Sequence, residues 1–247
     1  MDIYRQGHPP TWVQTKPLDP SLASSGPRQA RELHPIGEFL NPEPEQSDIC
    51  LSQSAMQAVR QKQYGGALSL LNQLVERHPD QAIYHSNRGL VYLWMGHLNE
   101  ALEDCTRAIR LNPDLDQAYN NRATCYAAMG KPNQALVDYE RAIDLNPFNT
   151  RARINLGVTL RDLGEFEAAL TCFDDALLFY QLPEFIYAER GRTYHQRGDW
   201  NCAIADYRRA LATLANQAET QASHQLNQRV QTWMAELIPG LDQSSVN

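Results

Sequence analysis

Residues 101–149 read ALEDCTRAIRLNPDLDQAYNNRATCYAAMGKPNQALVDYERAIDLNPFN, and one pattern occurs in them twice at a spacing of 34 residues. RLNP at 110–113 recurs as DLNP at 144–147. One alanine recurs at the same spacing along the chain, as Ala67, Ala101, Ala135, Ala169 and Ala203. A fixed period of this length is typical of a protein built from stacked copies of one small unit.

Aligning these alanines divides the chain into five contiguous units without insertion or deletion. The units, numbered here as repeats 1 to 5, are 48–81, 82–115, 116–149, 150–183 and 184–217. Position 8 of each unit is small: Ala55, Gly89, Ala123, Gly157 and Gly191. Position 24 is mostly large: Leu71, Cys105, Tyr139, Phe173 and Tyr207. Small side chains opposite large ones let two antiparallel helices approach closely and interlock.

Glycine and proline divide each unit into two helices. Position 15 is glycine in repeats 2 to 5, at Gly96, Gly130, Gly164 and Gly198. Position 32 is proline in repeats 1 to 3, at Pro79, Pro113 and Pro147. Glycine favours the end of a helix and proline cannot continue one. The sequence therefore predicts an all-α protein with ten repeat helices.

With this period and this small, large and proline pattern, the chain resembles the tetratricopeptide repeat family over residues 48–217. The resemblance implies a right-handed superhelical solenoid of five helix-turn-helix repeats. Repeat 1 departs from the pattern with Lys62 at position 15, and repeat 4 has Gln181 where proline is expected. Terminal repeats of a solenoid commonly differ because one of their sides has no neighbouring repeat.

Three segments outside the repeats are predicted from composition. Residues 1–47 hold eight of the fourteen prolines and few apolar residues, which predicts a disordered tail because little surface can be buried. Residues 218–239 are predicted to form a capping helix, and 240–247 a flexible C-terminus. The apolar stripe of the cap comprises Ala222, Leu226, Val230, Trp233, Met234 and Leu237.

Composition argues against several classes of protein. The 22 Lys and Arg against 29 Asp and Glu leave a net charge of −7, which provides no overall positive field for nucleic acid. No apolar run is long enough to span a bilayer, and the N-terminus lacks a secretory signal pattern, so a cytoplasmic protein without membrane insertion is predicted.

Five scattered cysteines suggest buried thiols in a reducing compartment. The 19 Arg against 3 Lys favour a GC-rich, bacterial source.

Motifs for catalysis or metal binding are not found in the sequence. It contains no phosphate loop, dinucleotide glycine fingerprint, H-E-x-x-H pair, nucleophile elbow or EF-hand loop. The seven histidines show no ligand-like spacing on a shared helix face. We therefore expect no enzyme activity, no cofactor and no metal site.

One pair of charged positions changes together between repeats. Positions 7 and 23 are Arg and Asp in three repeats, as Arg88 with Asp104, Arg122 with Asp138, and Arg190 with Asp206. In repeat 4 both change, to Leu156 and Cys172. The joint change predicts that the two positions touch and form structural ion pairs. Ligand binding by these arginines is less favoured because each already has a matched acceptor.

The family resemblance also implies a concave groove lined by the first helix of each repeat. Position 6 on that face is a carboxamide in four successive repeats: Gln53, Asn87, Asn121 and Asn155. The row resembles the asparagine ladder in the repeats of O-linked N-acetylglucosamine transferase, where side-chain amides bind the backbone of an extended peptide. A carboxamide donates and accepts at once, so it suits a main chain of any sequence. The alternative is that some of these amides only complete the helix surface.

The two ends of the implied groove differ in character. Further predicted partner contacts are two residues at an apolar end and three at a charged end: Leu90, Trp94, Arg151, Arg161 and Arg192. The arginines would favour an acidic stretch of the partner. The alternative is that Asp162 and Glu189, on the same face, neutralise them. Of the residues with which similar repeats clamp chaperone C-termini, only Asn87 is present, which argues against a chaperone adaptor.

These observations predict a non-enzymatic interaction protein, a scaffold or assembly factor that holds an extended protein segment in its groove. One alternative is a regulatory subunit that contacts its partner mainly through the tail 1–47, whose most apolar stretch is LHPIGEFL at 33–40. A more distant alternative is an enzyme accessory domain. The identity of the partner and the oligomeric state are left open.

Overall fold

The structure is a computed structural model that describes residues 44–179, 181–215 and 221–237. This part of the chain contains eleven helices and no strand. The helices are α1 (Pro44–Arg60), α2 (Tyr64–Arg77), α3 (Ala82–Met95), α4 (Leu98–Leu111), α5 (Asp116–Ala128), α6 (Pro132–Leu145), α7 (Thr150–Asp162), α8 (Phe166–Leu177), α9 (Pro183–Arg197), α10 (Trp200–Ala215) and α11 (Gln221–Leu237). The predicted C-terminal segment 240–247 and most of the predicted tail lie outside the described residues.

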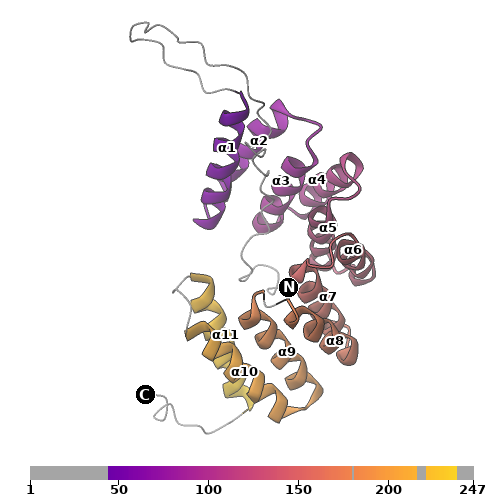
Figure 1. The fold of residues 1–247 in the computed structure, drawn as a ribbon, viewed down its shortest axis with the longest axis vertical. Coiled ribbons are helices and arrows are strands. Elements are labelled where there is room, and N and C mark those ends of the chain that lie inside the picture. The colour runs from indigo at the N-terminus through magenta and orange to yellow at the C-terminus, as the bar shows by residue number, and fades with distance from the viewer. Residues whose placement is uncertain (1–43, 180, 216–220, 238–247) are drawn as a thin grey trace, which may run out of the picture.

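The helices form consecutive pairs along a curved path from α1 to α11 (Figure 1). The two helices of each repeat pack on each other, and the second helix packs on the first helix of the next repeat. First helices of neighbouring repeats also touch, α3 with α5, α5 with α7, and α7 with α9. Helices α4, α6 and α8 lie on the outer side of the curve (Figure 1). The predicted all-α solenoid of helix-turn-helix repeats is confirmed.

The small residue at position 8 of the first helix packs against the residue at position 24 of the second helix, as predicted. A Cβ atom on Gly157 would lie 2.9 Å from two ring carbons of Phe173. A Cβ atom on Gly191 would lie 2.8 Å from the ring of Tyr207. Both rings are fully buried, so glycine provides space that no other residue leaves free.

Left-handed backbone conformations end the first helices at position 15. The four glycines there have φ between 71° and 95°, and Lys62 has φ 59° at the same position of repeat 1. Leu182 has φ 55° immediately before α9, in the repeat that has Gln181 in place of proline. A positive φ is rare for residues other than glycine, which marks these two turns as departures from the pattern.

The first helix begins earlier than predicted: α1 starts at Pro44, whereas the sequence predicts that the folded part starts at residue 48. The prolines of 1–47 predict a tail, but proline also fits the first turn of a helix, where its missing N–H has no intrahelical partner. Asp48, one turn further, is 6% exposed and accepts a hydrogen bond of 2.9 Å from Arg77 of α2. Burial opposes its ionisation, but hydrogen bonds from His78 and Arg77 lower the pKa of Asp48.

Helix α11 covers the end of the last repeat, as predicted for the cap. Leu226 and Val230 are 1% and 0% exposed, and they belong to one apolar cluster with residues of α9 and α10. The ring of Trp233 lies 5.9 Å from the ring of Tyr207, measured between centroids. The side chain of Ala222 and residues 218–220, 238 and 239 lie outside the described residues.

The cysteines differ from the prediction. Cys105 and Cys125 are buried and Cys172 is half-buried, where burial raises the pKa of its thiol to about 11. Cys50 and Cys202 are exposed, so the prediction of buried thiols is wrong for these two. None of the described helices is both long and apolar enough to cross a membrane.

Candidate functional site

The three predicted ion pairs are present, each between the two helices of one repeat. Arg122 donates from Nε to Asp138 Oδ2 at 2.7 Å and from Nη2 to Oδ1 at 2.8 Å. The pairs Arg88–Asp104 and Arg190–Asp206 have the same fork geometry, with distances from 2.6 to 2.9 Å. In repeat 4 the equivalent Leu156 is buried in an apolar cluster that includes Cys172. These arginines therefore serve the fold.

Two of these arginines also link neighbouring repeats. Arg88 Nη1 donates to Asn72 Oδ1 of repeat 1 at 3.0 Å, and Arg190 Nη1 donates to Asp174 Oδ1 of repeat 4 at 2.5 Å. Both acceptors stand at position 25 of the preceding repeat. The two positions do not change together across repeats, since Arg122 follows Thr106 and Leu156 follows Glu140, so the sequence pattern carries no signal for this contact.

Two amides of the position-6 row link first helices to each other. Asn121 Nδ2 donates to Ser86 Oγ of α3 at 3.2 Å, and Asn155 Nδ2 donates to Asn120 Oδ1 of α5 at 3.1 Å. In both cases the acceptor stands at position 5 of the preceding repeat. The amide groups of Asn121 and Asn155 are thus engaged within the chain, which is the alternative role considered for them.

Asn87 differs from both of these residues. It is 1% exposed, and neither Nδ2 nor Oδ1 has a hydrogen-bond partner among the described residues. The residue at position 5 of the preceding repeat is Ser52, but α1 contacts α3 less extensively than α3 contacts α5. A buried polar group without a partner is costly, by about 1–3 kcal/mol. Gln53, the fourth member of the row, is exposed on α1.

The predicted apolar end divides into a core residue and a surface residue. Leu90 is 5% exposed and packs in a cluster with Leu93, Ala101 and Cys125, so it belongs to the core and not to a partner-contacting surface. Trp94 is half-buried at the end of α3, with its ring centroid 5.9 Å from that of Tyr64.

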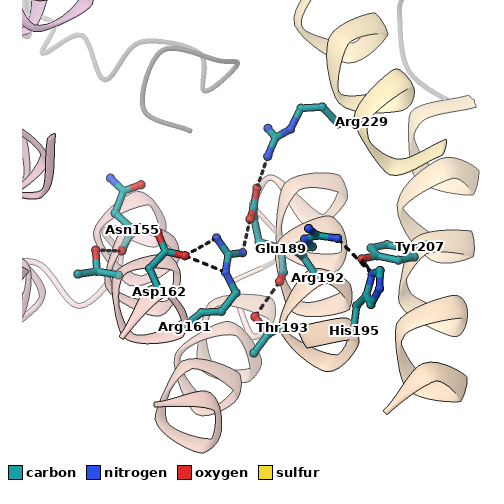
Figure 2. A network of polar contacts seen from close by, with 10 residues as sticks. Asn155, Arg161, Asp162, Glu189, Arg192, Thr193, His195, Tyr207 and Arg229 are labelled. Carbon is teal, nitrogen blue, oxygen red and sulfur yellow. Dashed lines mark hydrogen bonds and ion pairs between the residues drawn. The ribbon is translucent and has the colours of Figure 1, made fainter. Parts of the chain in front are cut away.

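Ion pairs within the chain occupy the predicted charged end (Figure 2). Arg161 Nη1 donates to Glu189 Oε2 at 2.7 Å, and its Nη2 donates to Asp162 Oδ1 at 3.0 Å. Arg229 of the cap donates to the other oxygen of Glu189 at 3.0 Å. The side chain of Arg161 is only 2% exposed. Burial opposes its charge, but Glu189 and Asp162 raise the pKa of Arg161.

The cap also covers Arg192, which donates to Glu236 of α11 at 2.6 Å. The guanidinium carbons of Arg192 and Arg229 lie 5.3 Å and 4.7 Å from the centre of the Trp233 ring. Arg151 is half-buried, and burial lowers the pKa of its guanidinium to about 10. The prediction that Arg161 and Arg192 meet an acidic partner is therefore corrected: both bind acidic residues of this chain, because the cap adds charges that complete the network.

Among the described residues, no cluster of three or more His, Cys, Asp and Glu side chains is arranged to hold a metal ion. Of the position-6 amides on α1, α3 and α5, Gln53 is exposed and Asn87 has no partner among the described residues, whereas Asn121 is engaged within the chain. The stacked helix pairs and the contacts between successive repeats define an α-solenoid.

Comparison with known proteins names the repeat. The family model of the tetratricopeptide repeat (TPR) matches residues 82–115 and 117–149, and a second model of the same repeat matches 150–181. The chain is a TPR protein. Sperm-associated antigen 1 of Rattus norvegicus is 27% identical over 113 residues, which are 41% of this chain and 12% of the rat protein. The chain therefore spans only a small part of that relative.

Solved structures with the same fold include TTC0263, a thermophilic TPR protein of Thermus thermophilus. It aligns with a TM-score of 0.67 at 22% identity, over 77% of this chain and 98% of its own. YrrB, a TPR protein with an unusual peptide-binding site, aligns with a TM-score of 0.50 at 19% identity, over 75% of this chain and 94% of its own. At these identities the likeness concerns the fold.

Proposed function

We propose that the chain is a non-enzymatic interaction protein, a scaffold or assembly factor, that holds an extended peptide segment on the inner face of α1, α3 and α5. One observation carries the proposal: Asn87 is buried with both amide atoms unpartnered among the described residues. The peptide-binding site of YrrB, a protein of the same fold, supports this class of function.

The chemistry of Asn87 suits a main chain. Its Nδ2 donates and its Oδ1 accepts, so the C=O and N–H of one residue in an extended main chain, which point to the same side, satisfy both groups. Gln53 provides a second, exposed carboxamide on the neighbouring first helix. Such main-chain contacts do not depend on the side chains of the peptide, so selectivity comes from contacts with those side chains. The half-buried ring of Trp94, on the same helix as Asn87, provides apolar surface for one side chain of the peptide.

The proposed site is confined to the N-terminal repeats. Towards the C-terminus, Arg161, Glu189 and the cap already satisfy one another. Binding through amides and apolar contacts depends little on ionic strength, whereas binding through exposed arginines weakens as salt screens the charges. The affinity of a bound peptide is therefore expected to change less than threefold between about 0.1 M and 1 M salt.

The test is a selection of random peptides displayed on phage against the full chain. Selected peptides are synthesised and their Kd values are measured for the wild type and for Asn87→Ala. Two hydrogen bonds are lost in the variant, so the Kd is expected to rise about tenfold or more. Asn133→Ala is the matched control, because Asn133 is an exposed amide on the outer helix α6, and its Kd should stay within twofold.

An unchanged Kd for Asn87→Ala would show that the peptides bind elsewhere. Circular dichroism of both variants checks that the helices remain folded. Since Asn87 has no partner among the described residues, its replacement by alanine is not expected to destabilise the chain.

A further inference from the structure

A hollow of about 240 Å³ lies between the C-terminal ends of the neighbouring first helices α5 and α7. Its wall includes Ala127, Ala128 and Pro132 of repeat 3, and Asp162 and Leu163 of repeat 4. Sites for whole small molecules have volumes of about 300–1,000 Å³, so a hollow of this size suits a single side chain.

The wall provides apolar contact for the stem of such a side chain. Leu163 is 44% exposed although it is large and apolar, and Ala127, Ala128 and Pro132 are half-buried. Long cationic side chains bury their methylene stems on apolar surface of this kind while the charged group stays close to water. The wall therefore fits a side chain with an apolar stem and a polar end.

One carboxylate oxygen at the hollow is unoccupied by the described residues. Arg161 donates to Asp162 from Nε at 3.2 Å and from Nη2 at 3.0 Å, and both bonds end on Oδ1 (Figure 2). Oδ2 accepts no hydrogen bond from the described residues, and the side chain of Asp162 is 39% exposed. This oxygen is therefore available to a donor from outside the chain.

Two main-chain carbonyls at the helix ends also lack a backbone donor. The C=O of Ala128 would accept from residue 132 in a longer helix, but Pro132 has no N–H. The C=O of Asp162 would accept from Phe166, whose N–H donates to Gly164 O at 3.0 Å instead. Acceptors of both helices thus remain open beside the hollow.

The charges around the hollow favour a cation. The guanidiniums of Arg161 and Arg229 are balanced by the carboxylates of Glu189 and Asp162. The C-terminal end of a helix carries about half a negative charge, and both α5 and α7 end at the hollow. Lys131, the adjacent cation in the sequence, is exposed and is not part of the wall.

We propose that the hollow binds one lysine side chain of a partner protein, with its stem on Leu163 and its ammonium between Asp162 Oδ2 and the C=O of Ala128. Lysine is favoured over arginine because a guanidinium pairs with both oxygens of a carboxylate, and Arg161 already occupies Oδ1. An ammonium has three donors and no fixed plane, so it suits acceptors that come from two helices. The site goes beyond the proposed function and does not depend on Asn87.

The test is an NMR titration of the full chain, labelled at its Ala, Leu and Val methyl groups, with Nα-acetyl-lysine methylamide. The methyl signals of Ala127, Ala128 and Leu163 are expected to shift and to saturate, with a Kd of about 1–10 mM for so small a probe. Val137, which is 64% exposed on the outer helix α6, should not shift. The arginine analogue should bind at least about threefold more weakly, and the Nε-acetylated and norleucine analogues at least about tenfold more weakly.

Two variants test the contacts separately. Asp162→Asn removes the proposed ion pair and should raise the Kd at least about fivefold, while Asp114→Asn, the same change at an exposed residue between α4 and α5, should stay within about twofold. Ala128→Met fills the hollow without altering the bonds between Arg161 and Asp162, and it should weaken binding to a similar degree. Circular dichroism checks that each variant is folded.

Several results would overturn the proposal. One is the absence of saturable shifts up to about 50 mM lysine probe, well above the expected Kd. Shifts of the same size at Val137, or equal binding of the norleucine analogue, would show that the probe does not recognise the hollow. Equal binding of the arginine analogue would overturn the assignment to lysine. An unchanged Kd in Ala128→Met would do the same for the hollow, even if Asp162→Asn failed to fold.

Discussion

Replacing Arg122 by alanine tests whether the ion pairs between the two helices of a repeat hold that repeat together. The side chains of Arg122 and Asp138 are 19% and 7% exposed, and two hydrogen bonds of 2.7 and 2.8 Å join them. The guanidinium also lies 5.6 Å and 5.9 Å from the rings of Tyr119 and Tyr126. Without Arg122, the carboxylate of Asp138 stays buried and loses both hydrogen bonds from the guanidinium.

The magnitude follows from this geometry. Loss of one partner of a buried ion pair costs about 3–5 kcal/mol, whereas an exposed pair contributes under about 1 kcal/mol. Asp138 is mostly but not completely buried, so we expect the lower figure, about 3 kcal/mol. For a domain of this size that corresponds to a fall in melting temperature of about 6–12 °C.

Repeat 4 provides the matched control. The double variant Arg122→Leu, Asp138→Cys copies the pair Leu156 and Cys172, so it removes both charges together. It is expected to stay within about 1.5 kcal/mol of the wild type, because an apolar pair of similar volume replaces a buried ion pair at little cost.

The assay is urea unfolding followed by circular dichroism under reducing conditions, with thermal melting alongside. A loss below about 1 kcal/mol for Arg122→Ala would refute the argument, because the pair would then behave as an exposed one. A double variant as unstable as the single one would also refute it, because the cost would then come from lost packing and not from an unpaired carboxylate.

Three further outcomes are expected. Burial opposes ionisation of Asp104, but hydrogen bonds from Arg88 and His85 lower its pKa. The contribution of Asp104 to stability is therefore present above the unfolded pKa of about 3.9 and is lost as pH falls through the folded pKa. Urea unfolding at pH 7, 5 and 3 should show that loss, and stability unchanged at pH 3 would contradict it. Gly157→Ala should destabilise the chain by about 1–3 kcal/mol, because its Cβ would lie 2.9 Å from an aromatic ring. Gly65→Ala has open space at its Cβ, so thermal melting should show it to be neutral or stabilising by up to about 1 kcal/mol. A thiol reagent at pH 7.5 should modify the exposed Cys50 and Cys202 rapidly and the other three cysteines only on unfolding, whereas five fast thiols would argue against the packing described.

The fold was predictable because five copies of one unit act as an internal alignment. Positions 8 and 24 always face each other within a repeat, so the alternation of small and large residues records that contact, as Gly157 and Phe173 show. Position 7 and position 23 record theirs by changing together, from Arg122 and Asp138 to Leu156 and Cys172. A contact that every repeat makes at a fixed offset can therefore be recognised from the residue types at its two positions.

The start of the first helix was not predictable in the same way. Pro44 has the local preference of a turn or tail residue, and it is helical because α1 packs on α2 and Asp48 binds Arg77. Contacts distant in sequence therefore settled a local ambiguity. The departures at Lys62 and Leu182 were visible as substitutions, but their positive φ values depend on the turns that connect packed helices.

The candidate site depended most on tertiary structure. Register placed Asn87, Asn121 and Arg161 on the inner face but did not show which of them had partners within the chain. That was decided by contacts made once and not repeated: the cap brings Arg229 to Glu189, and Ser86 accepts from Asn121, while α1 lies too loosely on α3 for Ser52 to do the same for Asn87. Periodicity records the interactions that every repeat shares, whereas hydrogen bonding and desolvation at a single position depend on the few neighbours that only the folded chain brings together.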